Sequence, residues 1–315
     1  LSAFSLMDAN SWSCPPWLLR RLKDHGGSIS FRDYMNLVLN DPNDGIYGSG
    51  RLRIGVKGDF VTSPSLGTDF GELLAIQLAD WFVQLKNLIP SGHPLALIEF
   101  GPGEGDLIEI LIRNFELICP EIIPLLQIIL VEPNPGMQLK QQQKLSNVSS
   151  VPVVWKSPED ISDDPVVGVI LAHEMLDALP VERLVLKNQH LWRQGISLIE
   201  SNDLPRISFN ELDIPSHLNQ SLDEVCKNLD IKIPPPHAED GWCTEWHSDL
   251  NEWLKQASSL LVFGSLLIVD YAIESSRYYT ARRSSGTLLA YRDQKASSSI
   301  LSEPGSWDLT SHLCV

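Results

Sequence analysis

The chain has 315 residues, 43% of them hydrophobic, which is enough to bury the core of one large domain or of two ordinary ones. Its 24 basic and 40 acidic residues give a formal net charge of −16, which repels nucleic-acid phosphates and anionic membrane surfaces. We therefore expect no nucleic-acid partner, and the charge favours a basic protein as the molecule that the chain meets.

Cysteine usage and hydropathy argue against further classes of protein. Five cysteines without a CxxC pair disfavour a disulfide framework and indicate a reducing compartment such as the cytoplasm. Cys226, His237, Cys243 and His247 match no standard zinc spacing, so no metal site is expected. No apolar run approaches the roughly 18 residues of a membrane span. Residues 1–16 show no targeting pattern.

The N-terminal region, residues 1–90, predicts helices around a long loop. Two short helices are expected within residues 17–40, the second capped by Ser30. Residues 41–67 are rich in Gly, Pro, Asn and Asp, which indicates an ordered loop system of functional length. Asp69 and Glu72 then stand as N-cap and N3 partner of a helix with one apolar stripe.

Residues 91–182 predict the core of an α/β fold. Short apolar runs of the buried-strand type alternate with helix-like stretches and lie at residues 95–100, 126–131, 151–155 and 166–172. The helix after the first run is expected from about residue 106 to 115. This alternation is typical of a parallel, doubly wound, Rossmann-like sheet.

The pattern changes after residue 182. Antiparallel strands are expected at residues 183–187, 190–199 and 206–209. Helices at 218–229 and 244–261 lead back to a strand at 266–271. The sequence thus predicts a smaller α+β lobe inserted at residues 183–257, for a substrate or partner, and a return to the core sheet at 258–315.

The clearest motif follows the first core strand and reads E-F-G-P-G-E-G at residues 99–105. Alternating glycines let the backbone approach a ligand closely, and the following helix aims N–H groups at it. The next strand ends at Glu132, which is placed to accept both hydroxyls of a ribose. The candidate cofactor-binding residues of the motif are Glu99, Gly101, Pro102, Gly103 and Gly105.

Two cofactor classes compete for this motif. The dinucleotide fingerprint is GxGxxG, whereas Gly105 comes one position too early for pyrophosphate packing. A carboxylate at Glu99 would oppose a pyrophosphate, but it can accept a hydrogen bond from the amino group of S-adenosylmethionine. The motif favours S-adenosylmethionine, and a nicotinamide-dependent oxidoreductase remains the alternative.

Further blocks carry a family resemblance, and they lie at residues 29–39, 41–42, 45–47, 58–64, 70–72, 99–103, 174–181, 269–271, 286–288, 304–305 and 308–312. With them the chain resembles the MidA-like methyltransferases, which include an arginine methyltransferase of mitochondrial complex I assembly. The resemblance implies a class I methyltransferase fold and S-adenosylmethionine as methyl donor. It also implies an arginine of a partner protein, such as a respiratory-complex subunit, as acceptor, and a mitochondrial location in a eukaryote.

Three positions depart from the family pattern. The family usually has Asn at His173, Tyr at Ile46 and Glu at Ser65. His173 ends the fourth core strand, where acceptor chemistry is expected, so this departure bears on the substrate. Family members continue beyond Val315, and we therefore expect the last strands of the sheet to lie outside this sequence.

The acceptor chemistry needs alignment and charge rather than covalent help, because methyl transfer from a sulfonium is an in-line displacement. An arginine guanidinium stays charged in water and needs a carboxylate to orient it. Glu174 and Asp177, in the loop that leaves the fourth strand, are the candidates, each weighed against a structural role. His173 is a candidate hydrogen-bonding group or a satisfied, partly buried histidine.

Three more residues are expected to touch the cofactor. Thr62 and Ser63, in the covering loop, are placed to reach its methionine part, and Asp160 to accept from its adenine amino group. A different hypothesis is a non-catalytic assembly factor that binds a partner through the inserted lobe and keeps the cofactor fold for stability. Cofactor binding without methyl turnover would support that hypothesis.

Overall fold

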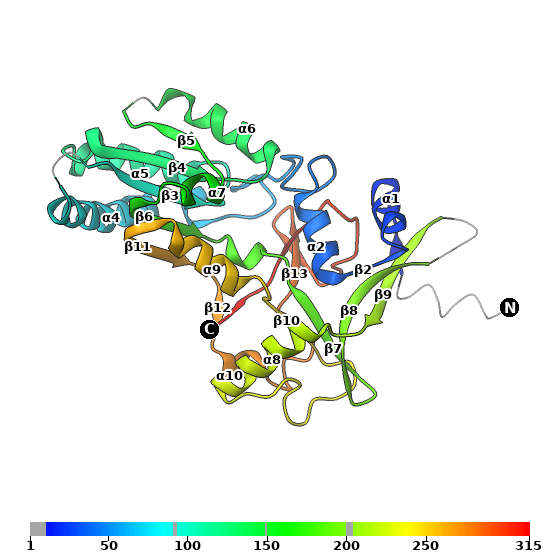
Figure 1. Ribbon diagram of the computed structural model, residues 1–315. Helices are drawn as coiled ribbons and strands as arrows, with labels where there is room; N and C mark the ends of the chain where they lie inside the picture. Colours follow the sequence, from blue (N-terminus) through cyan, green and yellow to red (C-terminus); the bar gives the residue numbers. More distant parts are fainter. Residues whose placement is uncertain (1–10, 91–92, 149, 200–203) are drawn as a thin grey trace.

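The computed structural model describes residues 11–90, 93–148, 150–199 and 204–315. Two sheets organise these residues (Figure 1). A five-stranded sheet with helices on both faces fills the upper left of the view, and a mainly antiparallel sheet fills the right. None of the helices within the described ranges is long and apolar enough to cross a membrane.

The five-stranded sheet is parallel throughout, with the strands in the order β11-β6-β3-β4-β5. The strands are β3 (Leu95–Phe100), β4 (Leu126–Val131), β5 (Val153–Trp155), β6 (Val166–His173) and β11 (Leu261–Val269). The continuous apolar runs that predicted the first four strands are those of a sheet buried on both faces. The expected α/β class is therefore confirmed.

Helices cover both faces of this sheet. On one face, α4 (Asp69–Leu88) and α5 (Asp106–Ile118) share a core with β3, β4 and β6. On the other face, α7 (Pro158–Ser162) and α9 (Leu250–Ser259) pack against the same strands through residues that include Ile161 and Ala257. The sheet is therefore doubly wound, as predicted.

The strand order creates a switch point between β3 and β6. From β3 the chain proceeds outward to β4, through α6 (Pro135–Lys144), and on to β5, and it then returns to the opposite side of β3 as β6. In sheets of this kind, ligands bind beyond the carboxyl ends of the strands at such a reversal. The topology thus directs attention to the ends of β3, β4 and β6.

The second sheet contains the three expected antiparallel strands, in the order β1-β9-β8-β7-β10, with β2 paired to β8. Its strands are β1 (Trp12–Ser13), β2 (Ser28–Ser30), β7 (Glu182–Lys187), β8 (His190–Ile199), β9 (Arg206–Leu212) and β10 (Cys243–Trp246). Since β1 and β2 come from the N-terminal region, the lobe is built from more than residues 183–257.

Three local predictions need correction. The helix expected from residue 244 starts at Leu250, because Thr244–Trp246 belong to β10 and pair with β7. The strand expected at 266–271 runs from Leu261 to Val269. Helix α4 has Thr68 at its N-cap, without a side-chain cap bond, so Asp69 is its first residue instead of its cap.

The N-terminal helices α1 (Pro16–Asp24) and α2 (Phe31–Asn40) share a core with residues of the second sheet and of the C-terminal region. The predicted cap of α2 is present, since the Ser30 hydroxyl oxygen accepts the backbone N–H of Asp33 at 3.0 Å. The other elements are α3 (Ser63–Leu66), α8 (Ser216–Leu229), β12 (Ala272–Ile273), α10 (Ser275–Tyr278), β13 (Leu289–Arg292), β14 (Lys295–Ser297), β15 (Asp308–Thr310) and β16 (Leu313–Cys314), with 3-10 turns at Ile123–Leu125, Leu145–Asn147 and Leu176–Ala178.

Candidate functional site

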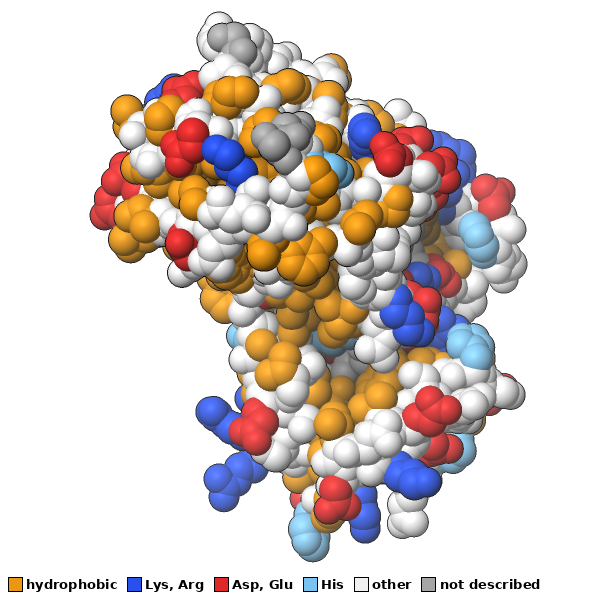
Figure 2. Space-filling model, turned by 60° about the vertical axis from the view of Figure 1, so that its left-hand side comes forward, with side chains coloured by type: hydrophobic (Ala, Val, Ile, Leu, Met, Phe, Trp, Pro, Cys, Tyr) orange, Lys and Arg blue, Asp and Glu red, His pale blue; other side chains and the backbone are white. Residues whose placement is uncertain are grey.

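A cavity of about 630 Å³ lies at the switch point. Its walls come from the glycine loop, the residues that follow β4 and β6, the long N-terminal loop and α9. Figure 2 shows the molecule hollowed between the parallel-sheet part above and the lobe below, with hydrophobic side chains along the hollow. The volume is in the range that holds a drug-sized or cofactor-sized ligand.

The glycine loop brings backbone to the cavity wall. Gly101 has φ +60°, and a Cβ there would lie 2.4 Å from Cγ of Met175, so no other residue fits without displacement. Pro102 and Gly103 line the cavity beside it. Gly105 is the N-cap of α5 and is not among the lining residues. The loop therefore offers peptide groups and the start of a helix to a ligand.

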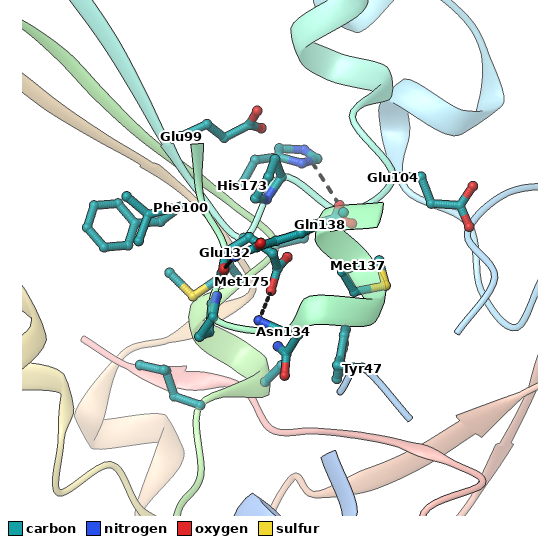
Figure 3. A pocket seen from close by; sticks show the side chains of 18 of the residues that line it. Tyr47, Glu99, Phe100, Glu104, Glu132, Asn134, Met137, Gln138, His173 and Met175 are labelled. Carbon is teal, nitrogen blue, oxygen red and sulfur yellow. Dashed lines mark hydrogen bonds and ion pairs between the residues drawn. The ribbon is translucent and has the colours of Figure 1, made fainter. Parts of the chain in front are cut away.

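Glu99, the last residue but one of β3, faces the cavity with a carboxyl group that is 2% exposed (Figure 3). Its Oε2 has no hydrogen-bond partner among the described residues. Burial raises the pKa of this carboxyl to about 8. A buried acidic group without a donor is costly unless a ligand supplies one.

Glu132 follows β4 and is also buried, at 7% exposed. Its Oε1 accepts the backbone N–H of Asn134 at 2.9 Å, and its Oε2 accepts Nε2 of Gln141 at 3.0 Å. Burial raises the pKa of Glu132, and these hydrogen bonds act in the opposite direction. Each carboxylate oxygen has two lone pairs, so the group can still accept from a ligand.

Gln141 is a site residue that the sequence analysis missed. Its side-chain amide donates to Glu132 and to the backbone oxygen of Gly103 at 2.9 Å, and its Oε1 accepts Nε1–H of Trp155 at 2.8 Å. It is fully buried. Gln138 and Gln141 lie one turn apart on α6, directly after Glu132, and this spacing was the available signal.

His173 is the last residue of β6, Glu174 follows it, and both line the cavity. His173 is 9% exposed, and its Nε2 has no hydrogen-bond partner. This atom lies 3.9 Å from Oε1 of Glu174. Burial lowers the pKa of His173 to about 4, so the imidazole is neutral at neutral pH.

Glu174 has a left-handed backbone, with φ +46°, which costs energy for a residue with a side chain. Burial, followed by the charge of Asp270, raises the pKa of its carboxyl. Asp270 holds the turn beyond it by accepting the backbone N–H groups of Met175, Leu176 and Asp177 at 2.8 to 3.3 Å. The chain thus keeps Glu174 at the cavity in a strained conformation.

Asp177 does not line this cavity, although it was predicted beside Glu174. It is 9% exposed and lines a second cavity of about 240 Å³, which shares Tyr47, Phe60 and Glu174 with the first. Its pKa lies well above the ordinary value, because of burial and then the charges of Asp270, Asp308 and Glu174.

Of the remaining predicted residues, one lines the cavity and two lie in short helices beside it. Thr62 lines the cavity, whereas Ser63 begins α3 and is not among the lining residues. The Asp160 carboxylate accepts the backbone N–H and hydroxyl of Ser157 and so caps α7, and its neighbour Glu159 lines the cavity instead. The structure therefore does not place Asp160 where it was expected to meet adenine.

Two aromatic residues of the wall were not predicted. Tyr47 comes from the N-terminal loop, and Trp253 comes from α9, where its ring meets Phe100 edge-on with 5.2 Å between centroids. Both reach the cavity through tertiary packing, which the sequence pattern alone does not reveal. Across the described ranges, no three His, Cys, Asp or Glu side chains are arranged to hold a metal ion.

Comparison with solved structures identifies the same fold. A crystal structure from Burkholderia thailandensis bound to S-adenosyl-homocysteine has a TM-score of 0.77 and 24% identity, covering 94% of this chain and 72% of that one. A native crystal structure from the same organism has a TM-score of 0.72, also at 24% identity, over 94% and 71%. Both support the class I methyltransferase fold.

Curated relatives are similar over most of the chain. The mitochondrial protein arginine methyltransferase NDUFAF7 of Bos taurus is 28% identical over 308 residues, and that of Danio rerio is 26% identical over 317. Each match covers 90% of this chain but only 63% and 66% of the relative, so the chain spans about two thirds of their length.

The family itself follows from a model match. The model described as "Putative S-adenosyl-L-methionine-dependent methyltransferase" matches residues 73–315, which include the glycine loop, Glu132 and the His173–Glu174 pair. This range is well over half of the chain. The chain therefore belongs to this family of S-adenosyl-L-methionine-dependent methyltransferases.

Proposed function

We propose that the chain binds S-adenosylmethionine in the 630 Å³ cavity and transfers its methyl group to an arginine side chain of a partner protein. The observation that carries this proposal is the buried, unpartnered Oε2 of Glu99 beside the glycine loop. It fits a ligand with an amino group, and it opposes the pyrophosphate of a dinucleotide. A nicotinamide-dependent oxidoreductase is therefore disfavoured.

The residues present fit each part of this cofactor. Glu99 would accept from the amino group, Gly101–Gly103 would lie against it through backbone, and Glu132 would accept from the ribose hydroxyls. Thr62, a residue of the covering loop, lines the cavity, and Ser63 follows it at the start of α3. Trp155 and Glu159 are better placed than Asp160 for the adenine end. The cofactor supplies an electrophilic methyl group on a sulfonium.

The acceptor side of the proposal rests on Glu174. A carboxylate there would orient a guanidinium and accept the proton that the nitrogen loses as it gains the methyl group. The raised pKa of Glu174 makes it a better base than an exposed carboxylate. Neutral His173 presents a free Nε2 within the same cavity and would fix the acceptor by a hydrogen bond. Asp177 does not line the cofactor cavity, so it would act on the acceptor indirectly, through its charge interaction with Glu174.

The proposals for the partner protein and the cellular location are based on the names of the relatives. Their names describe mitochondrial protein arginine methyltransferases, so we propose a protein substrate, such as a respiratory-complex subunit. The same names support a mitochondrial location if the source is a eukaryote and a cytoplasmic one otherwise. The net charge of −16 suits an arginine-rich segment of the substrate.

A second candidate function is a non-catalytic assembly factor that binds S-adenosylmethionine. The observation in its favour is His173, which stands where the family usually has Asn. The two functions differ in turnover rather than in cofactor binding.

Calorimetric titration with S-adenosylmethionine, S-adenosylhomocysteine and NADH tests the cofactor. We expect the two adenosyl sulfur compounds to bind and NADH not to bind. Transfer of radiolabelled methyl to mitochondrial proteins, followed by amino-acid analysis for methylarginine, then tests the reaction. Binding without any labelled arginine would favour the non-catalytic assembly factor, and binding of NADH alone would refute the methyltransferase proposal.

A further inference from the structure

The second cavity, of about 240 Å³, adjoins the cofactor cavity and carries an unusual set of side chains. The two cavities share Tyr47, Phe60 and Glu174 as a common wall. Beyond this wall the second cavity is lined by two more carboxyls and by aromatic rings: Asp177, Asp308, Tyr271 and Tyr291. A group that entered it would therefore reach Glu174 without passing the glycine loop, which lines only the first cavity.

Asp177 and Asp308 are buried and Glu174 is partly buried, and the three carboxyls have few hydrogen-bond donors. Asp308 is 1% exposed, and the Tyr47 hydroxyl donates to its Oδ1 at 2.8 Å. The Tyr271 hydroxyl donates to Oε1 of Glu174 at 3.4 Å, and the backbone N–H of Ala178 donates a hydrogen bond to the carboxyl of Asp177. Two carboxylate oxygens accept about four hydrogen bonds in all, so each group has capacity left.

No positive charge balances this cluster within the described part of the chain. None of the ion pairs there joins a lysine or arginine to Glu174, Asp177 or Asp308. Burial raises the pKa of Asp308 to about 7, and the neighbouring carboxyls add to the rise at Asp177. A cation in the cavity would offset the energetic cost of ionising these carboxyls.

A further polar group without a partner lies in the first cavity, next to the shared residue Glu174. His173 is nine-tenths buried, its Nε2 has no partner, and it lies 3.9 Å from Oε1 of Glu174. His312, which lines the second cavity edge-on to Tyr271, has a pKa lowered by burial and is neutral at neutral pH. Neither imidazole repels a cation.

We propose that the second cavity binds the alkylguanidinium head of the acceptor arginine between the carboxyls of Asp177 and Asp308 and the ring of Tyr271, with its attacking nitrogen at Glu174. A planar guanidinium has five N–H donors for carboxyls from different directions and stacks on aromatic faces. This inference rests on the proposed function and adds the residues that select its substrate.

The chemistry favours a side chain over free arginine. An α-carboxylate would face the same acidic wall, whereas a peptide backbone carries no such charge. A lysine ammonium has three donors around one point and matches less well a set of carboxyls that come from two separate segments of the chain. The blocked amino acid N-acetyl-argininamide is therefore the probe, with free arginine and the blocked lysine and citrulline compounds as comparisons.

The test uses the full chain saturated with S-adenosylhomocysteine and measures probe binding by calorimetry. In the variant Asp308→Asn, the probe should bind about tenfold or more weakly, because a charge-assisted hydrogen bond is lost. Tyr271→Ala removes a half-exposed ring and should also weaken binding. The control Asp213→Asn changes an exposed carboxyl of the other lobe and should have no effect.

The outcomes separate this inference from the proposed function. Equal probe affinity in Asp308→Asn, Tyr271→Ala and the parent, with S-adenosylhomocysteine still bound, would overturn the inference, as would equal binding of the neutral citrulline compound. Tighter binding of free arginine would assign the cavity to a free amino acid and also overturn it. Failure of S-adenosylhomocysteine to bind the parent would instead refute the proposed function.

Discussion

Gln141 and Glu132 are joined by a hydrogen bond of 3.0 Å between Nε2 and Oε2, fully inside the protein. The same amide also holds the backbone oxygen of Gly103 and the indole of Trp155. One buried side chain thus connects the glycine loop, the end of β4 and the end of β5, which are the three segments proposed to surround the adenosine part of the cofactor.

The variant Gln141→Leu should lose both stability and cofactor affinity. It removes three hydrogen bonds, one to the buried Glu132 and two to partly buried partners, so we expect unfolding free energy to fall by about 2–4 kcal/mol. Urea unfolding and titration with S-adenosylhomocysteine measure the two effects. Gln143→Leu, on the exposed side of the same helix, is the matched control. Unchanged affinity in Gln141→Leu would show that this link does not shape the site.

Glu99→Gln should weaken S-adenosylmethionine binding while leaving the fold intact. The amide has the size of the carboxyl, but it cannot pair as a charged acceptor with the amino group of the ligand. We expect affinity to fall by about tenfold or more, since hydrogen bonds to charged groups contribute about 1.5–3 kcal/mol. Calorimetry on both proteins checks this, and equal affinities would remove Glu99 from the site.

Glu99 also predicts a pH dependence of stability in the protein without cofactor. Its pKa is raised from the ordinary 4.5 to about 8, so the unfolded chain releases this proton at lower pH than the folded one. The contribution of Glu99 is therefore fully present below pH 4.5 and is lost as pH rises through 8, at up to about 1.4 kcal/mol per pH unit.

The measurement for this prediction is urea unfolding at several pH values between 5 and 8, for the parent and for Glu99→Gln. The difference in unfolding free energy between them should shift in favour of the variant as pH rises. A difference that stays constant over this range would mean that the carboxyl is already ionised in the folded protein.

Local sequence signals predicted the part of the site that local structure makes. This part consists of the glycine loop, Glu132 and the His173–Glu174 pair. Each of them follows an apolar strand, and the continuous apolar run of the strand predicts its burial. The alternation of these strands with helices then placed their carboxyl ends on one edge. The topology places Glu99, Glu132 and Glu174 around one cavity.

The rest depends on contacts between distant segments. Thr244–Trp246 look helical in sequence, yet they form a strand because β7 offers them a free edge. Asp160 was expected in the site, but Ser157, three residues earlier, provides it with a closer local partner. Tyr47 and Asp308 lie 261 residues apart, and their hydrogen bond can be known only from the fold.

His173 can be tested with two substitutions of opposite character. His173→Asn restores the residue that the family usually has and keeps a hydrogen-bonding group, so turnover should stay within a few-fold of the parent. His173→Leu removes that group, and we expect kcat to fall about tenfold or more, with little change in cofactor affinity. Methyl-transfer kinetics with a fixed substrate protein give both values. Equal kcat in both variants would assign His173 a structural role.

Glu174 combines a left-handed backbone with a carboxyl that shares its surroundings with Asp177 and Asp270. Both features oppose folding, the first by steric strain and the second by repulsion between acidic groups. A residue kept for stability alone would not combine them, so the strain itself argues for a role in the site.

Glu174→Gly should therefore stabilise the protein while abolishing methyl transfer. Glycine adopts φ +46° without strain and carries no charge, and we expect unfolding free energy to rise by about 0.5–1 kcal/mol. Gln189→Gly, which relieves a similar φ of +60° in the turn between β7 and β8, should give a comparable gain with full activity. Thermal unfolding and methyl-transfer assays on the two variants make the comparison. A Glu174→Gly protein that is less stable than the parent would show that the carboxyl holds the fold together, and one that keeps its activity would exclude Glu174 from the reaction.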